Sequence, residues 1–405
     1  MPHPGLIIGI LTYIGIALGR YPGLAMDRTG IALLGAIALV AAGVISSTEA
    51  MSAVDGPTLL LLYALMVLSA QLRLGGFYTW AALRLTRLMD RPLRFLALMM
   101  LTTAFISAFV ANDIVCLAFT PVLTVALLRR GLKPVPFLLG LVMACNIGSA
   151  GTLIGNPQIM LIGQAGALSF GAYSAWCIPP SLASLAAAWG LIAWTNRGKL
   201  EQPPVEPPAS FERIPFDRWQ STKGGLAFGV LLVLFFTPVP REWAALCLAG
   251  LMLCSRRMHT RSILGLVDWH LLTLFFGLFI VVRGIDASGA LTRAVAALSR
   301  AGGDLRQPYL LAGVAVFLSN LVSNVPASML LIRFLDGAPV ESWYTLSLAT
   351  TYAGNLLTIG SLANLILIEQ ARRHGVVITF RDYVRTGIPV TLLSLGFLAL
   401  WIRVA

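Results

Sequence analysis

The sequence predicts an all-α polytopic membrane protein made of two inverted five-span repeats, each with a re-entrant helical hairpin and a broken transmembrane helix. Its composition is that of a membrane protein, because 58% of the residues are hydrophobic, 11% are charged and the mean hydropathy is +0.83. A soluble protein has about 25% charged residues. Apolar runs long enough to cross a bilayer recur along the whole chain. Two of these runs are interrupted by the same residue pattern, which predicts the repeats.

The two interruptions lie 209 residues apart and align without gaps. The first runs from Asn146 to Pro157, and the second runs from Asn355 to Asn364. The aligned pairs are Asn146 and Asn355, Ser149 and Thr358, Gly151 and Gly360, Thr152 and Ser361, and Leu153 and Leu362. Glycine, hydroxyl and amide residues are unfavourable in the middle of a membrane helix unless the helix opens there. Opened helices in matching positions of two halves indicate a transport site.

The first repeat is predicted to occupy residues 1–195. We expect, in order, three spans, an amphipathic segment, a hairpin, a broken helix and a final span, at 4–20, 29–46, 57–73, 74–89, 92–128, 134–165 and 169–195. The segment Ala111-Asn112-Asp113 interrupts the apolar region at 92–128 and marks the tip of the hairpin. A membrane tolerates such a tip only where it is buried in protein or lines a cavity.

A polar stretch at 196–223, with Pro203-Pro204 and Pro207-Pro208, predicts a cytoplasmic linker. The second repeat, 224–405, has the same order, with elements expected at 224–238, 241–255, 264–283, 286–301, 308–335, 344–372 and 381–403. Its hairpin, 308–335, is interrupted at Ser323-Asn324-Val325-Pro326, and its broken helix is 344–372. Five crossings per half is an odd number, so the second half would be inverted about an axis in the membrane plane.

The net charge of +12 is explained by orientation rather than by a nucleic-acid partner. Most of the 29 Lys and Arg residues fall on one side of the expected topology, as the positive-inside rule requires. We therefore expect a multi-pass protein of the bacterial cytoplasmic (inner) membrane. The exceptions fit an interfacial amphipathic helix on the outer side: Arg283, Arg293, Arg300 and Arg306. The five cysteines show no paired metal spacing, so no metal site is expected.

Asp113 is the one acidic residue with deep apolar sequence on both sides. An ionisable residue inside the membrane costs roughly 3 kcal/mol on insertion scales and indicates a functional site. Its expected role is that of a proton carrier or a cation ligand, since burial favours the neutral form of a carboxyl group. The alternative is a carboxylate that only caps the second helix of the hairpin. The second tip, Ser323 and Asn324, carries no charge.

The interruptions supply both side chains and backbone groups to the expected site. Free carbonyl groups of an unwound helix bind cations, and free N–H groups bind anions or hydroxyl groups. We expect substrate contacts from Asn112, Asn146, Ser149, Thr152, Asn156, Ser323, Asn324, Asn355, Thr358, Ser361 and Asn364. Ion coupling is assigned to Asp113 and Asn112, with the backbone at Gly148, Gly151 and Gly360. The glycines could instead serve helix packing alone.

Two cysteines lie beside these residues. Cys116 follows Asp113 by three positions, and Cys145 immediately precedes Asn146. Thiolates attract soft centres such as trivalent arsenic. Cysteines in membrane helices more often act as small hydrophobic residues, and we favour that interpretation.

The motifs together resemble the ion transporter superfamily, which includes divalent anion:sodium symporters, arsenite/antimonite permeases and sodium/proton antiporters. The resemblance covers nearly the whole chain and rests on Ala111-Asn112-Asp113, Thr120-Pro121, Gly155-Asn156-Pro157-Gln158, Ser323-Asn324-Val325-Pro326 and Gly360-Ser361-Leu362. It implies a scaffold domain, a mobile transport domain, a homodimer and elevator-type alternating access. No motif of an intramembrane enzyme is present, so a transporter without a cofactor other than a coupling ion is expected.

The substrate follows from how the tips depart from the dicarboxylate branch. That branch typically has Ser-Asn-Thr at both tips, whereas Asp113 and Val325 stand at the third positions here. An ionised Asp113 would repel a dianion, while arsenite is largely neutral at pH 7 and fits an amide-lined site without fixed positive charge. We therefore expect proton-coupled export of arsenite or antimonite, with a possible cytoplasmic ATPase partner. The alternatives are a sodium-coupled (di)carboxylate or other anion transporter and a sodium/proton antiporter.

Overall fold

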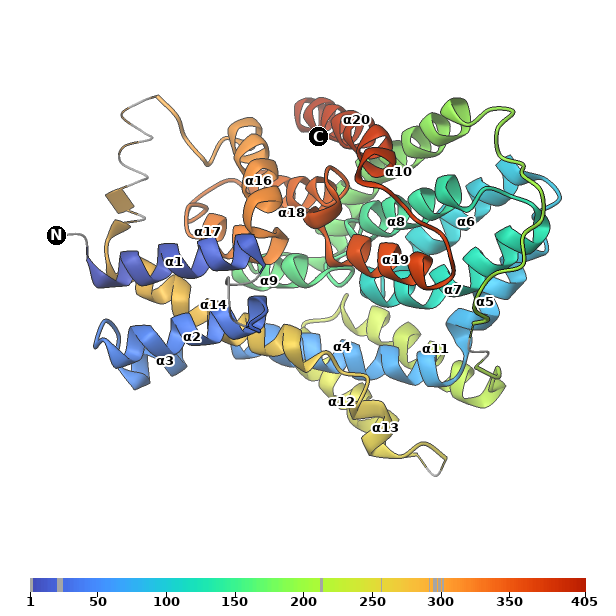
Figure 1. Ribbon diagram of the computed structural model, residues 1–405. Coiled ribbons are helices and arrows are strands. Elements are labelled where there is room, and N and C mark those ends of the chain that lie inside the picture. Colours follow the sequence, from blue (N-terminus) through green and yellow to red (C-terminus); the bar gives the residue numbers. More distant parts are fainter. Residues whose placement is uncertain are drawn as a thin grey trace.

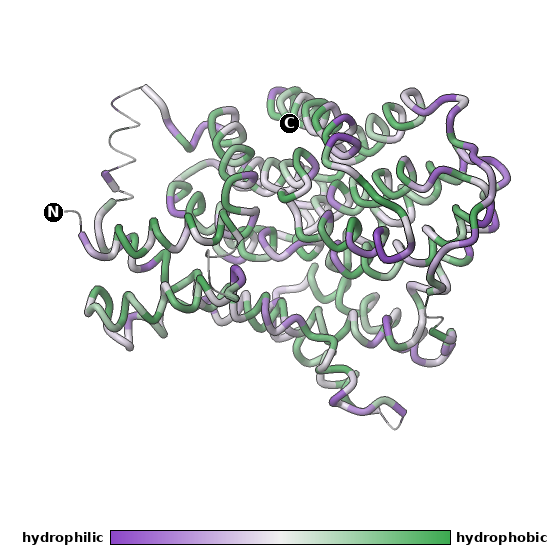
Figure 2. The backbone as a smooth tube through the Cα atoms, viewed as in Figure 1, coloured by the Kyte–Doolittle hydropathy of each residue, from purple (hydrophilic) through white to green (hydrophobic). Residues whose placement is uncertain are grey.

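The computed structural model describes residues 3–19, 25–211, 214–255, 257–290, 292–293, 297, 300 and 302–405. These residues form helices and no strand, as the sequence predicts (Figure 1). Five of the helices are long and apolar enough to cross a membrane: α4 (Gly56–Leu74), α7 (Asn112–Arg130), α10 (Phe170–Thr195), α14 (Trp269–Ala287) and α20 (Phe380–Val404). Hydrophilic residues gather in the connections at the right of the view (Figure 2).

The remaining elements follow the order predicted for the two halves, except that two short helices, α3 and α13, are additional. In the first half they are α1 (Pro4–Leu18), α2 (Arg28–Ala41), α3 (Ser47–Ala53), α5 (Phe77–Thr86), α6 (Pro92–Ser107), α8 (Pro134–Ser149) and α9 (Pro157–Ala165). In the second half they are α11 (Arg218–Leu234), α12 (Arg241–Leu253), α13 (Thr260–Leu264), α16 (Pro308–Val322), α17 (Asn324–Ile332), α18 (Val340–Ala353), η1 (Thr358–Gly360) and α19 (Leu362–Arg373).

Both predicted hairpins and both broken helices are present. Helices α6 and α7 form the first hairpin, and α16 and α17 form the second. The first broken helix consists of α8 and α9, separated at residues 150–156. The second consists of α18 and α19, separated by a stretch that contains η1. Because each broken helix crosses as two pieces, neither piece alone has the length of a span.

The packing is symmetric between the halves. Helix α2 packs against α14 while α4 packs against α12, and α6 packs against α8 while α16 packs against α18. Helices α4 and α14 run in opposite chain directions, and the hairpins lie on opposite sides of the view (Figure 1). These relations are those of an inverted repeat. The division of the chain into repeats at 1–195 and 224–405 stays a prediction.

Small residues bring the first hairpin close to the first broken helix. Gly140, Ala144 and Gly148 lie four residues apart on α8, and a Cβ atom at Gly148 would lie 2.3 Å from the carbonyl oxygen of Ala104 on α6. At Gly140 a Cβ atom would lie 2.9 Å from a methyl carbon of Leu96. Small residues at this spacing let membrane helices approach each other closely. The tip of the hairpin is thereby held against the break in α8.

The connection between the halves is bound to the protein at both ends. On its first side, Lys133 N donates to Leu200 O at 2.8 Å and Val205 N donates to Leu128 O at 3.0 Å. On its second side, Asp217 N donates to Gly75 O at 3.0 Å. We call residues 200–217 the strap, because they join the end of the first hairpin to the α4–α5 turn.

Two expectations change in this region and beyond it. The predicted linker 196–223 is too long, because α11 begins at Arg218, where the side chain of Asp217 accepts a hydrogen bond from Gln220 N at 3.0 Å. The polar side chain of Gln220 bonds Gln71 in α4 and is buried, so polarity alone misplaced the boundary. Part of the amphipathic segment expected at 286–301 lies outside the described residues, namely 291, 294–296, 298–299 and 301. Arg283 pairs with Asp286 at 3.7 Å.

We expect Gly148→Ala to destabilise the protein. The added methyl group would meet the backbone of Ala104, which cannot move aside as a side chain would, and overpacking of this kind costs about 1–3 kcal/mol. Thermal unfolding in detergent measures the effect. Gly190→Ala in α10 is the control, because a Cβ atom there meets nothing within 4 Å. An unchanged melting temperature for Gly148→Ala would show that α6 and α8 are not held this closely.

Candidate transport site

A cavity of about 450 Å³ lies where the two hairpin tips meet the second pieces of the two broken helices. Both halves contribute to its walls, which also include the end of α1 and the starts of α2 and α14. Six residues predicted from the sequence line it: Asn112, Asp113, Asn156, Ser323, Asn324 and Ser361. Sequence positions more than 200 residues apart therefore meet at one cavity.

The two hairpin tips have the same construction. Asn112 is the first residue of α7 and Asn324 is the first residue of α17, so these two side chains occupy equivalent positions. The turn before Asn324 is tight, because Ser323 has a backbone φ of +78°, a value that residues other than glycine rarely adopt. Asn324, with its amide nitrogen toward the backbone, donates to Thr350 O at 3.1 Å and to Gly360 O at 3.2 Å.

Asp113 faces the cavity from the first turn of α7. The N-terminus of α7 has no side-chain capping bond, so the carboxylate does not serve as a hydrogen-bonded cap. Within the described residues it takes part in no hydrogen bond or ion pair with another side chain. A carboxylate without a partner in such a place is free to take up a proton or a cation.

Asn146 connects the two broken helices behind the cavity. Its Nδ2 donates to Asn355 Oδ1 at 2.9 Å and to Asn364 Oδ1 at 3.1 Å. Its Oδ1 accepts from Asn112 Nδ2 at 2.8 Å and from Ser361 Oγ at 3.2 Å. Asn146 and Asn355 are the pair that the aligned interruptions predict to be equivalent, and the structure bonds them directly. We call these five side chains the amide cluster.

The other predicted residues lie beside this cluster rather than in the cavity wall. Ser149 Oγ donates to Asn146 O at 2.8 Å and accepts from Asn156 Nδ2 at 3.2 Å. Thr152 Oγ1 donates to the carbonyl of Ala108 at the first tip. Thr358 begins η1 and is half-buried. None of the following predicted residues lines the cavity: Asn146, Ser149, Thr152, Asn355, Thr358 and Asn364, with Gly148, Gly151 and Gly360.

Sequence reasoning missed six polar residues of the cavity. They are Asp27, Arg28 and Thr29 around the start of α2, Gln158 at the start of α9, and Asp268 and His270 at the start of α14. Gln158 is buried, and its Nε2 donates to Thr351 Oγ1 at 3.3 Å. Asp268 caps α14 by accepting from Leu271 N at 2.9 Å. The available signal was that Arg28 and Asp268 each stand directly before a membrane-length apolar run.

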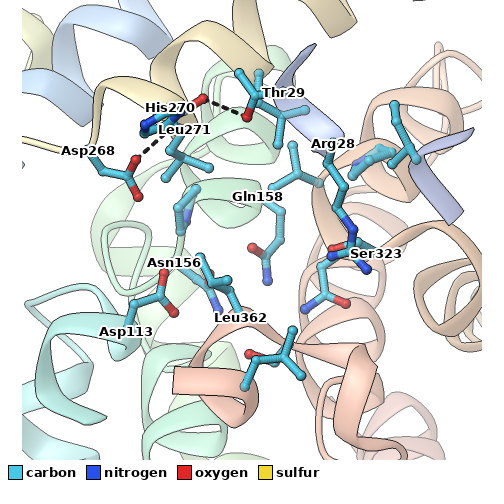
Figure 3. A pocket seen from close by; sticks show the side chains of 18 of the residues that line it. Arg28, Thr29, Asp113, Asn156, Gln158, Asp268, His270, Leu271, Ser323 and Leu362 are labelled. Carbon is cyan, nitrogen blue, oxygen red and sulfur yellow. Dashed lines mark hydrogen bonds between the residues drawn. The ribbon is translucent and has the colours of Figure 1, made fainter. Parts of the chain in front are cut away.

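The cavity has a basic side and an acidic side (Figure 3). Arg28 points toward Ser323 on one side, while Asp113 and Asp268 lie on the other side. The amide of Gln158 lies between the two sides. The expectation of a site without fixed positive charge is therefore wrong. It failed because Arg28 was assigned to membrane orientation, whereas α2 begins at the cavity and directs this side chain inward.

The two cysteines near the site are buried and do not line the cavity. Ser107 Oγ donates to the backbone carbonyl of Cys145 at 2.8 Å, so this residue contributes a backbone group to the packing of the first hairpin. Their position agrees with the preferred interpretation, in which Cys116 and Cys145 act as small hydrophobic residues.

Comparison with known proteins assigns the family. The family model described as a citrate transporter, CitMHS, matches residues 13–353, which include both hairpins, the first broken helix and all of α18. The chain belongs to the CitMHS citrate transporter family. CitMHS proteins lie within the superfamily that the sequence motifs resemble, and the chain is a membrane transporter rather than an enzyme.

Relatives from distant organisms align over nearly the whole chain. An uncharacterized transporter of Mycobacterium tuberculosis is 29% identical over 96% of this chain and 98% of its own length. The silicon efflux transporter LSI3 of rice, Oryza sativa subsp. japonica, is 28% identical over 92% of this chain and 91% of its own. Among solved structures, the YdaH transporter of Alcanivorax borkumensis has a TM-score of 0.57 and 16% identity, over 99% of this chain and 98% of that one. This likeness supports the fold.

We expect Asn146→Ala to lower stability more than Asn355→Ala. The first substitution removes an amide with four side-chain partners, whereas Asn355 accepts one bond and its buried Nδ2 has no partner in the described structure. A net value of about 1 kcal/mol for each hydrogen bond sets the scale of the difference. Thermal unfolding of the two variants in the same detergent makes the comparison, and equal losses would refute the central role of Asn146.

Proposed function

We propose that this CitMHS transporter exports arsenite or antimonite across the bacterial cytoplasmic membrane in exchange for protons. One observation carries the proposal: Asp113 faces a cavity lined by amide and hydroxyl groups, and it has no hydrogen-bond or ion-pair partner among the described residues. The relationship to a silicon efflux transporter supports it, because silicon, like trivalent arsenic, exists in neutral water as an uncharged hydroxide. Elevator-type movement within a homodimer is part of the same proposal.

The chemistry follows from what a lone carboxylate requires. An ionised carboxylate without partners is unfavourable in a membrane interior, so the empty carrier returns readily only when Asp113 holds a proton. Hydroxyl groups of the solute can donate to the ionised carboxylate in place of that proton. The amide groups of Asn156, Gln158 and Asn324 can both donate and accept, which suits a solute whose hydroxyl groups do the same. Proton and solute therefore alternate at Asp113.

The cavity opens toward the cytoplasm under the predicted orientation. Its scaffold side consists of the end of α1 and the starts of α2 and α14, which the distribution of basic residues places on the cytoplasmic side. We infer that the structure is the inward-facing state, in which an exporter collects its solute.

Reconstituted vesicles test the proposal directly. We expect arsenite movement in the wild type to follow an imposed proton gradient and to ignore a sodium gradient. In Asp113→Asn, the proton gradient should lose its effect, because an amide cannot take up and release a proton at neutral pH. Succinate and citrate serve as comparison solutes. Arsenite flux that ignores the proton gradient in the wild type, or coupling that survives Asp113→Asn, would refute the mechanism.

A second candidate is the transport of a carboxylate anion, and Arg28 favours it. A guanidinium group binds carboxylate oxygens through paired hydrogen bonds, and Arg28 has no ion pair with a described residue. The description of the matching family as a citrate transporter agrees with such a substrate. Sodium coupling, or sodium/proton antiport, would place the cation near Asn112 and Asp113.

Arg28→Gln separates the two candidates. A hydrogen bond to a charged group contributes about 1.5–3 kcal/mol, so the apparent affinity for a carboxylate substrate should fall about tenfold or more. Arsenite transport should change by less than about twofold, because a neutral solute forms no ion pair with this residue. Arg87→Gln is the control, since Arg87 is exposed and outside the cavity wall. A large loss of arsenite affinity in Arg28→Gln would contradict the binding of arsenite as a neutral solute.

A further inference from the structure

A second cavity lies at the other end of α8, away from the transport site. Its volume is about 470 Å³, and it is bounded by the start of α8, the end of α10 and the start of α20. Residues from all three helices line it, among them Val135, Thr195, Lys199, Asp382, Arg385 and Thr386. The predicted orientation places these helix ends on the cytoplasmic side. The transport mechanism proposed above uses none of these side chains.

The charges of this cavity favour an anion. Lys199 and Arg385 form no ion pair with any carboxylate in the described part of the chain. Asp382 is already engaged, because its Oδ2 accepts from Thr379 N at 3.1 Å and from Thr379 Oγ1 at 2.6 Å in the capping box of α20. The N-terminus of α8, a helix of 16 residues, adds the positive end of its dipole. Two cations, one carboxylate and a helix start thus face one polar space, and the cations outnumber the carboxylate.

The surroundings of the cavity are those of a bilayer interface. Helices α10 and α20 pack against each other and expose apolar side chains, such as Leu182 and Leu392, along their outer faces. Trp194 stands on α10 next to the cavity-lining Thr195 and is 74% exposed. Tryptophan at the end of a membrane helix is typical of the headgroup layer. A phosphate group at this depth would belong to a lipid whose acyl chains lie along α10 and α20.

We propose that this cavity binds the phosphate group of an anionic lipid headgroup through Lys199 and Arg385. Basic pockets between membrane helices on the cytoplasmic side bind such headgroups. The position of the cavity, at the inner end of lipid-facing helices, selects a lipid over a soluble phosphate.

Two of the three helices connect the lipid-binding cavity to the transport site. Helix α8 leads from Val135 to Asn146 of the amide cluster over about 17 Å. Helix α20 carries Gly387, where a Cβ atom would lie 2.3 Å from the backbone carbonyl of Asn355. The helix also carries Tyr383, whose hydroxyl group donates to Gly354 O at 3.4 Å. A lipid that fixes the inner ends of α8 and α20 therefore stabilises both partners of the Asn146–Asn355 bond.

Lipid retention by the purified protein tests the proposal. Wild type and Lys199→Gln/Arg385→Gln are purified in a neutral detergent, supplied with phosphatidylglycerol or phosphatidylcholine, and examined by native mass spectrometry and thermal unfolding. We expect the wild type to retain phosphatidylglycerol in preference to phosphatidylcholine and to melt at a higher temperature with it. Retention should fall about fivefold for each charge removed.

Arg381→Gln is the matched control. Arg381 is exposed one turn before Arg385 on α20 and does not line the cavity, so its loss should leave retention of phosphatidylglycerol unchanged. Equal losses in Arg381→Gln and Arg385→Gln would mean a diffuse surface attraction and would overturn the site. The same holds for equal retention of the two lipids by the wild type. A melting temperature raised by inorganic phosphate alone, without an effect of phosphatidylglycerol, would overturn the choice of a lipid.

Discussion

The bond between the amides of Asn146 and Asn355 is the interaction on which the centre of the molecule depends. Each broken helix ends inside an apolar layer, where its free backbone and side-chain polar groups need partners. Asn146 meets this need for both halves, because it also binds Asn112 at the first hairpin tip and Ser361 and Asn364 at the second break. One side chain thus holds two breaks and one tip in register, and the cavity forms in front of them.

The cavity combines two kinds of wall with different physical properties. The amide cluster and Asn324 form a neutral wall, in which most polar atoms already have partners within the protein. Arg28 and Asp268, at the starts of α2 and α14, and Asp113, next to Asn112 at the first hairpin tip, are charged groups that face the open space. The neutral wall gives the site its shape. In the proposed mechanism, the charged groups respond to protons, ions and solutes, so they decide what the transporter carries and what drives it.

The sequence was sufficient to predict the hairpins and broken helices, because polar interruptions in apolar runs mark them and the repeat confirms each one with a second copy. It was insufficient for Arg28, Asp268 and His270, since residues at helix starts look the same whether they face water, lipid or a cavity. It also could not separate Asn146, which lies behind the wall, from Asn112, which lies in it. That distinction depends on which face of each broken helix packs against its neighbours. The start of α11 was hidden for a similar reason, because its polar first turn is buried against α4.

The strap sets a limit on the distance that the parts of this protein can travel. Val205 is fixed to the first hairpin and Asp217 to the α4–α5 turn, with a short connecting chain between them. A fully extended chain spans about 3.3–3.6 Å per residue, so this connection reaches roughly 40 Å at most. Any displacement of the hairpin relative to that turn must stay within this length. In the proposed elevator movement, this covalent segment limits the stroke of the carrier, independently of the solute that it moves.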